Sequence, residues 1–161
     1  MGKKRTGAMW VFAIIIALLV AGWAILKTLD LIASKDPQNF SELPKITVKG
    51  PAGNLRVALA NTEESLGKGI SGQEKLRDIH GVLLIPPKKS TSITMLGVKF
   101  PLDIVWLDDD NRVVHILHSV NPGIWPLMIR SPQPARKVLE VPAGKLKKLG
   151  TVSVGDQLTL S

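Results

Sequence analysis

Residues 6–26 read TGAMWVFAIIIALLVAGWAIL and contain no charged side chain. Basic residues flank this stretch on both sides: Lys3, Lys4, Arg5 and Lys27. At about 1.5 Å of rise per residue, a helix of this length is about 31 Å long, which matches a bilayer hydrocarbon core of about 30 Å. Trp10 and Trp23 lie near the two ends, where indole side chains favour the boundary between lipid and water. The sequence therefore predicts one transmembrane helix over residues 6–26.

The charges at the two ends of this helix predict its orientation. The N-terminal flank has three basic side chains and no acidic one, whereas the C-terminal flank mixes lysines with Asp30 and Asp36. Positively charged flanks remain in the cytoplasm, so the N-terminus is expected there. We therefore expect residues 1–5 to form a cytoplasmic basic tip, residues 27–44 a tether, and residues 45–161 a periplasmic or extracellular domain. The protein would then be a single-pass protein of the cell membrane.

A cleaved signal peptide is the alternative interpretation of the same stretch, because it also combines a basic start with an apolar centre. The apolar run here exceeds the about 7–15 residues that are usual in a signal peptide. Its nearest small-x-small sequence, Gly22-Trp23-Ala24, is a poor cleavage site. The chain has no cysteine, so a lipoprotein anchor is excluded. We favour a retained anchor.

Ala13, Ala17 and Ala21 recur at every fourth position of the helix. A stripe of small residues lets two membrane helices approach closely, so a homodimer through these alanines is one interpretation. Alanine is common in any apolar helix, however, and we favour the interpretation that the stripe arises by chance.

The rest of the chain has the length of one small domain. Three of the 21 Lys and Arg residues precede residue 26 whereas all 13 Asp and Glu residues follow it, so the remainder carries a net charge of +5. This charge suits an anionic envelope polymer or lipid surface, although we favour the simpler interpretation that it keeps the domain soluble. The absence of cysteine excludes disulfides and thiol chemistry. Nucleic-acid binding is not expected, because aromatic residues are few and no dense basic run is present.

Short apolar runs, separated by Gly, Pro and Asn, begin at residue 45. Strands are expected at residues 46–48, 55–60, 82–85, 93–95, 102–107, 113–120, 138–141 and 158–160. Short helices are expected at residues 62–68, 74–79 and 145–149. Residues 121–134, which contain four prolines with one Gly and one Ser, are expected to form a long loop. The pattern predicts a mainly β domain, a compact antiparallel sandwich or flattened, jelly-roll-like barrel with a few short helices, preceded by one transmembrane α-helix.

Several local patterns occur in a recognisable order along this domain. They are LRVALANTEE at 55–64, GISGQEKL at 69–76, GVLL at 81–84, FPLDIVWLDDD at 100–110, VLEVPAG at 138–144 and VGD at 154–156. Together they resemble the domain of unknown function 192, also called uncharacterised protein family 0127, over about residues 45–161. The resemblance implies a compact, mostly antiparallel β domain that is often exported behind a signal sequence or anchor. It implies no established activity, substrate or cofactor.

The chain departs from the pattern of this family in two places. Members often carry Trp-Met-Lys-Asn-Thr just before the PLD segment, whereas residues 94–98 read TMLGV here and only Met95 is shared. Members also often carry a Pro-Cys pair in the loop that corresponds to residues 121–134, and this chain has no Cys. Any site that the family builds from those polar residues would be lost from this chain.

Asp103 is the first candidate for a functional residue, because it directly follows Pro101-Leu102 at the expected start of a strand. A carboxylate in that place could bind a ligand or act as a base. Its oxygens could instead accept backbone N–H groups of the adjoining loop, and we favour this structural role. The catalytic candidates are Asp103, His115 and Glu140.

The candidates for ligand binding are Met95, Asp103, Trp125 and Arg130. Trp125 lies in an apolar part of the long loop, which could be a ligand platform, a wedge that touches the membrane, or a flap that seals the β core. His115 and His118 are three positions apart, so on a strand they point to opposite faces and cannot share one metal ion. We therefore expect no metal site and no cofactor.

The sequence favours a binding or accessory module at the cell envelope. The reasons are the membrane anchor, the mild positive charge and the lack of an assembled catalytic motif. Its partner would be an envelope polymer, a membrane protein or the lipid surface. The alternative is an envelope-acting enzyme of the hydrolase type, in which Asp103, a histidine and Glu140 converge in one cleft. A third interpretation is a structural domain that stabilises a membrane complex.

Overall fold

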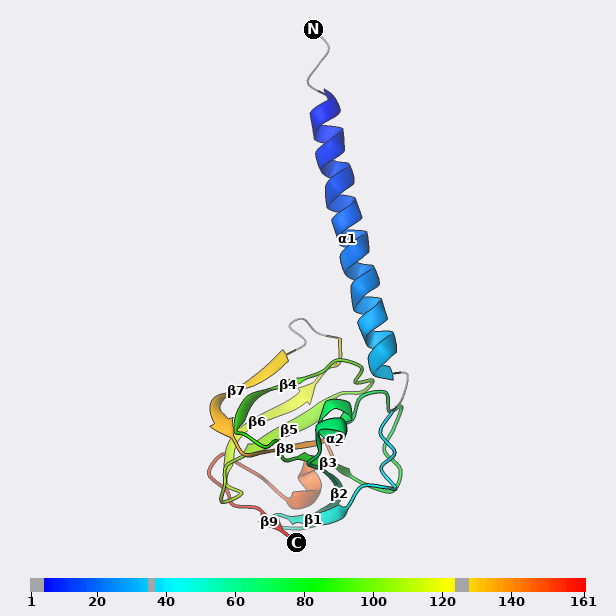
Figure 1. Ribbon diagram of the computed structural model, residues 1–161. Coiled ribbons are helices and arrows are strands. Elements are labelled where there is room, and N and C mark those ends of the chain that lie inside the picture. Colours follow the sequence, from blue (N-terminus) through cyan, green and yellow to red (C-terminus); the bar gives the residue numbers. More distant parts are fainter. Residues whose placement is uncertain (1–4, 35–36, 124–127) are drawn as a thin grey trace.

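The computed structural model describes residues 5–34, 37–123 and 128–161, and it begins with helix α1 (Arg5–Ser34). Figure 1 shows that α1 projects from a β-rich domain. Within α1, the segment Trp10–Thr28 is long and apolar enough to cross a membrane. An N-terminal signal sequence has the same properties, so retention of the helix and its orientation stay predictions. The helix ends at Ser34, close to Pro37, since proline disfavours the helical conformation of the residue before it.

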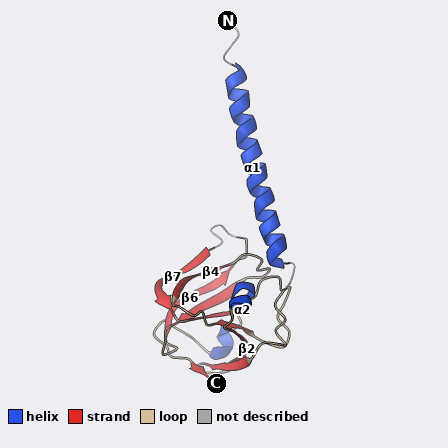
Figure 2. Ribbon diagram, in the orientation of Figure 1, coloured by secondary structure: helices blue, strands red, loops and turns tan. Residues whose placement is uncertain are grey.

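The domain is built on a curled sheet of seven strands in the described residues, with the order β6-β5-β8-β3-β2-β1-β9. These strands are β1 (Lys45–Lys49), β2 (Asn54–Ala60), β3 (Gly81–Leu84), β5 (Leu102–Leu107), β6 (Val113–Val120), β8 (Lys137–Pro142) and β9 (Thr159–Leu160). Two further strands, β4 (Ser90–Thr94) and β7 (Met128–Ala135), pair with each other in a small second sheet. Helices are short: α2 (Glu63–Lys68) and the 3₁₀ helix η1 (Leu146–Leu149). Figure 2 shows how strand dominates the domain, so the predicted mainly β class is confirmed.

The curled sheet is apolar on both faces. One face carries Ala58, Val82, Ile104, Trp106 and Val138, which pack with residues of the small sheet such as Ile93 and Ala135. The other face carries Val57, Leu83, Val105, Leu139 and Val141, which pack with η1 and the C-terminal segment. Because side chains alternate between the faces of a strand, the central strands read as almost continuous apolar runs. Burial on two faces explains why their sequence shows little alternation.

One connection of the sheet is parallel. Strands β2 and β3 pair in parallel, whereas the other strand pairs are antiparallel. The chain between them is long enough for such a crossover and contains α2, as the sequence predicts. Thr62 caps α2, because its side chain accepts a hydrogen bond from the Ser65 N–H while the Ser65 hydroxyl accepts one from the Thr62 N–H.

Two predicted elements are wrong. Residues 74–79 form bends rather than a helix, and the chain there extends toward β3, where His80 N–H donates to the Arg56 carbonyl at 2.7 Å. The predicted loop at 121–134 ends early, because β7 begins at Met128 despite two prolines. These prolines lie where the β4–β7 register is irregular, between the pairs Ser90↔Ala135 and Ser92↔Arg130, so their missing N–H groups interrupt no regular ladder.

The close approach of β3 to β8 gives a direct test of the sheet. A Cβ placed on Gly81 would overlap the Glu140 carbonyl oxygen and lie 2.6 Å from Cγ1 of Val141. We expect Gly81→Ala to lower the free energy of unfolding by about 1–3 kcal/mol, the usual cost of overpacking. Gly67→Ala is the matched control, because a Cβ at position 67 would meet nothing within 4 Å and alanine favours the helix by about 0.5–1 kcal/mol. Urea unfolding followed by near-UV circular dichroism measures both, and equal effects of the two substitutions would contradict the observed strand packing.

Candidate functional site

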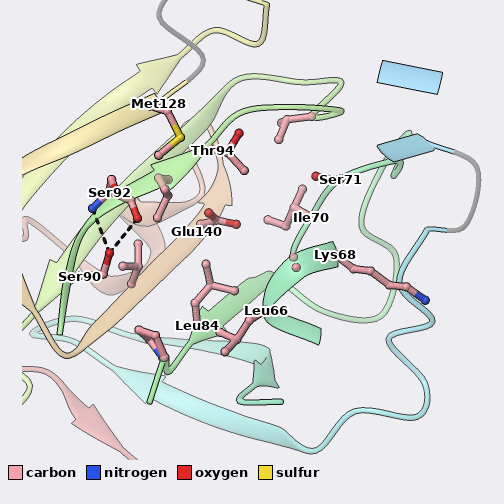
Figure 3. Close-up of a pocket in the computed structure, with 16 residues that line it drawn as sticks. Leu66, Lys68, Ile70, Ser71, Leu84, Ser90, Ser92, Thr94, Met128 and Glu140 are labelled. Atoms are coloured by element: carbon pink, nitrogen blue, oxygen red, sulfur yellow. Dashed lines mark hydrogen bonds between the residues drawn. The ribbon is translucent and has the colours of Figure 1, made fainter. Parts of the chain in front are cut away.

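A cavity of about 310 Å³ lies between one face of the curled sheet, α2 with the segment after it, and strand β4 (Figure 3). Most of its lining is apolar: Leu66, Ile70, Leu84, Ile93, Val98, Met128 and Val138. The polar exceptions come from β4, from Ser71, from Lys68 and from Glu140. A small concave cavity with apolar walls and a few polar groups has the general composition of a ligand site.

Glu140 lies in β8, an inner strand of the curled sheet, and is only 5% exposed. It pairs with Ile104 and lies two positions from Val138, so its side chain is on the same sheet face as both. Figure 3 shows its carboxyl group inside the cavity, between Ile70 and β4. Within the described part of the chain, no hydrogen bond or ion pair of this carboxyl group is found. Burial alone raises the pKa of Glu140 to about 7, because the apolar surroundings disfavour the charged form.

Lys68 is the cation that lines the same cavity, but its ammonium group is directed elsewhere. Its Nζ lies 3.0 Å from Oε1 of Glu64, one helical turn earlier on α2. Figure 3 shows the Lys68 side chain extending away from Glu140. The buried carboxyl group therefore has no cationic neighbour of its own among the described lining residues.

The hydroxyl groups around the cavity are partly used by the backbone. Ser71 Oγ donates to the Leu96 carbonyl at 2.7 Å, and Ser90 Oγ donates to the Ser92 carbonyl at 3.1 Å. Thr94 Oγ1 accepts the Leu96 N–H at 3.1 Å, which leaves its own O–H and a second lone pair for other partners. Ser92 and the exposed Thr94 line the same cavity as Glu140 (Figure 3).

Asp103 lies on the opposite face of the sheet from Glu140. It pairs with Val141 and shares its face with Val105, which belongs to the second apolar cluster. Its Oδ1 accepts the Ser119 N–H at 3.0 Å and its Oδ2 accepts the Gly144 N–H at 2.8 Å. The Asp103 carboxylate therefore holds two neighbouring turns in place.

The backbone is left-handed at both turns, which is unfavourable at Ser119 but not at Gly144, since glycine adopts positive φ freely. Ser119 has φ of 52° and Gly144 has φ of 79°, which is the left-handed region of the backbone. The irregular pairing of β5 with β6 falls at the same place, opposite Asp103. His118 Nδ1 lies 3.6 Å from Asp103 Oδ1, but the His118 side chain is 63% exposed. The contacts of Asp103 are those of a structural carboxylate.

The other residues predicted from the sequence lie apart from Glu140. His115 stacks at a tilt on Trp106, with 5.4 Å between ring centroids, and Met95 is a buried core residue. Arg130 is exposed on β7, opposite Ser92. Trp125 lies outside the described residues, so its role stays a prediction. Asp103, His115 and Glu140 do not converge in one cleft.

Sequence reasoning missed the cavity wall formed by β4. Its sequence, STSIT, carries a hydroxyl group at four of five positions, and this is the signal that could have identified it. The sequence analysis also did not predict that residues 69–71 line the cavity, because their glycine and serine are typical of a turn.

Fold and site together define a small β domain with an apolar cavity and a single buried carboxyl group in it. The chain belongs to the DUF192 family, whose model, described as an uncharacterized ACR, matches residues 45–160. This finding confirms the family resemblance of the sequence.

Two solved structures are similar to this chain. One is a crystal structure of a "putative transcription regulator" from Sinorhizobium meliloti, with 27% identity, a TM-score of 0.62, and coverage of 72% of this chain and 92% of that one. The other is a protein of unknown function from Novosphingobium aromaticivorans, with 26% identity, a TM-score of 0.63, and coverage of 77% of this chain and 91% of that one. The comparison with curated proteins finds no match.

Burial of Glu140 predicts a pH-dependent stability. The carboxyl group keeps its proton up to about pH 7 in the folded state but loses it near the ordinary pKa of 4.5 when unfolded. Folding therefore binds a proton between these values, and stability falls as the pH rises. We expect the free energy of unfolding to drop by about 2 kcal/mol between pH 5 and pH 8 through this group, and Glu140→Gln to remove that drop. Urea unfolding at both pH values measures it, and parallel profiles of the two proteins would contradict the assignment.

Loss of the Asp103 carboxylate should destabilise the domain. In Asp103→Asn one of the two N–H groups, of Ser119 or Gly144, faces an amide NH₂ instead of a carboxylate oxygen. A hydrogen bond to a charged group contributes about 1.5–3 kcal/mol. Asp110→Asn is the matched control, since Asp110 is exposed and such surface changes stay within about 0.5 kcal/mol. An Asp103→Asn protein with the urea midpoint of the wild type would show that the two bonds contribute little.

Proposed function

We propose that this protein is a binding module at the cell envelope and that the Glu140 cavity is its ligand site. In this proposal α1 is a retained anchor with its N-terminus in the cytoplasm, and residues 45–161 lie outside. The ligand is a small, mainly apolar molecule. At the about 30 Å³ that one water occupies in the liquid, a cavity of about 310 Å³ has room for about ten non-hydrogen atoms.

The single observation that carries the proposal is a buried carboxyl group aimed into an apolar cavity without a partner in the described chain. Burial of such a group costs stability, whether it stays protonated or becomes charged. An apolar side chain at position 140 would complete the core at lower cost. Groups that are costly for folding and have a strongly shifted pKa cluster at functional sites.

Binding is favoured over catalysis by the distribution of the polar groups. An acid–base mechanism needs a second titratable group within hydrogen-bond reach of the first or of the substrate. Lys68 is paired with Glu64, and Asp103 lies on the other face of the sheet. The envelope-acting enzyme that uses Asp103 and a histidine is therefore the weaker alternative.

Membrane attachment is supported by the length and apolar character of Trp10–Thr28 and by the basic residues that precede it. A reporter enzyme fused after Ser161 should be active only outside the cytoplasm, and the mature protein should keep Met1 or Gly2 at its N-terminus by mass spectrometry. A mature N-terminus near Ile25, or a reporter active only in the cytosol, would overturn this part of the proposal.

The binding site is tested with 1-octanol as the probe, because its nine non-hydrogen atoms fit the cavity. The full chain is placed in lipid nanodiscs, and methyl resonances of the lining residues Leu66, Ile70 and Val138 are followed by NMR. We expect saturable shifts of these methyl groups, while methyl groups of Leu149 and Leu158 on the other face stay unchanged.

Ile93→Trp is the matched variant, because Ile93 lines the cavity and packs with the curled sheet, so an indole ring at this position would occupy cavity space. We expect octanol to lose its effect on Leu66, Ile70 and Val138 in this variant. Shifts of equal size in the wild type and in Ile93→Trp would reveal partition into lipid only and would overturn the assignment of the site.

A further inference from the structure

We propose that the ligand of the Glu140 cavity is an organic cation, namely a primary amine on an apolar chain or ring whose ammonium group pairs with the Glu140 carboxylate. This inference rests on the proposed function and names the class of molecule that the cavity takes. It depends on three properties of the cavity: its unmatched charge, its acceptors and its apolar depth.

The first property is charge. A carboxylate buried in apolar surroundings needs an opposite charge, and the described lining residues supply none, because Lys68 is paired with Glu64 at 3.0 Å. A ligand with an ammonium group would supply this charge. A neutral ligand would leave the carboxyl group protonated, and an anionic ligand would place two like charges in one small cavity.

The second property is the set of hydrogen-bond acceptors. An ammonium group has three N–H donors and no acceptor. Inside the cavity, Glu140 offers two carboxylate oxygens as acceptors. Ser92 and the exposed Thr94 also line the cavity, and Thr94 Oγ1 keeps one lone pair free. The Glu140 oxygens are therefore the acceptors that a buried ligand head would meet.

The third property is the apolar wall that surrounds these acceptors. Leu66, Leu84, Ile93 and Val138 line the rest of the cavity, and Met128 is 44% exposed at its edge. A flexible thioether adapts to ligands of different shape. The chemistry fits a cationic head with a tail of about eight carbon atoms, given the space for about ten non-hydrogen atoms.

The direction of the Glu140 pKa supports this assignment and predicts a proton exchange. The empty site holds a proton on Glu140 up to about pH 7. When an ammonium ligand binds, the O–H bond of Glu140 breaks, its proton goes to solvent, and the carboxylate pairs with the N–H groups of the ligand. The affinity for an amine should therefore rise as the pH rises through 7. Charged groups on the elements around the site have other partners. Lys68 and Glu64 on α2 are paired with each other, Arg136 donates to the Pro86 carbonyl, and Lys137 on β8 donates to the carbonyls of residues 108 and 109. Arg130 on β7 is exposed.

The experiment compares three probes of equal length, namely 1-octylamine, 1-octanol and octanoate, on the full chain in nanodiscs of zwitterionic lipid. Dissociation constants come from the methyl shifts of Ile70 and Val138 at pH 6 and pH 8. We expect octylamine to bind at least tenfold more tightly than octanol at pH 8 and to gain at least threefold in affinity from pH 6 to pH 8. Octanoate should bind most weakly at pH 8.

Three variants separate charge from fold. Glu140→Gln keeps the size of the side chain and should bring octylamine to the affinity of octanol. Glu140→Asp keeps the charge on a shorter side chain and should retain part of the preference. Asp110→Asn removes one exposed carboxylate outside the cavity and should bind all three probes as the wild type does.

Each outcome bears on the inference. Equal affinities of octylamine and octanol for the wild type, or tightest binding of octanoate, would overturn the amine assignment and leave the proposed binding function intact. The absence of saturable shifts with all three probes would overturn both. A preference for octylamine that persists in Glu140→Gln would show that another group binds the cation and would also overturn the inference.

Discussion

Strand β8 is bonded on both edges and covered on both faces, and the rest of the domain depends on this constraint. It pairs with β3 on one side and with β5 on the other. Val138 packs into one apolar cluster, whereas Leu139 and Val141 pack into the other. A strand in this position has no face turned to water, so each polar side chain on it must be satisfied inside the protein or be costly. Glu140 is the residue of β8 where this requirement is not met.

The two buried carboxylates of the sheet show how the same chemical group can have opposite roles. Asp103 and Glu140 are 2% and 5% exposed. They lie on the adjacent strands β5 and β8, and their side chains are on opposite faces of the sheet. Asp103 accepts two backbone N–H groups, so its charge is compensated by donors that the fold itself must place there. Glu140 faces aliphatic side chains, so only a ligand in the cavity could compensate its charge. The two carboxyl groups are similarly buried, and the hydrogen-bond donors around each of them determine its role.

Much of the fold could be predicted from the sequence, because it depends on local patterns. Strands β5 and β6 and the helix α2 follow from apolar runs and turn residues, whose effects act over a few residues. The sequence favours a structural role for Asp103 with N–H groups of the adjoining loop. Its donors are indeed backbone N–H groups, but they belong to Ser119 and Gly144, which are 16 and 41 positions away, so these partners could not be predicted locally. The cavity could not be predicted in this way. It requires α2, β4 and β8 to meet, and no local pattern fixes which face of β8 they cover.

The two walls of the cavity, the small sheet and strand β8, are held in the fold by different interactions. Glu140 lies on the floor, in a strand held by hydrogen bonds on both edges, whereas β4 and β7 bond only to each other in the described structure. The small sheet is attached to the curled sheet by side-chain packing, through Ile93 and Ala135, and not by a strand ladder. Thr94 and Ser92 belong to this small sheet, whereas the Glu140 carboxyl group belongs to the curled sheet. The charge of the site is therefore fixed by main-chain hydrogen bonds, and the wall opposite it is held by apolar contacts of β4 and β7.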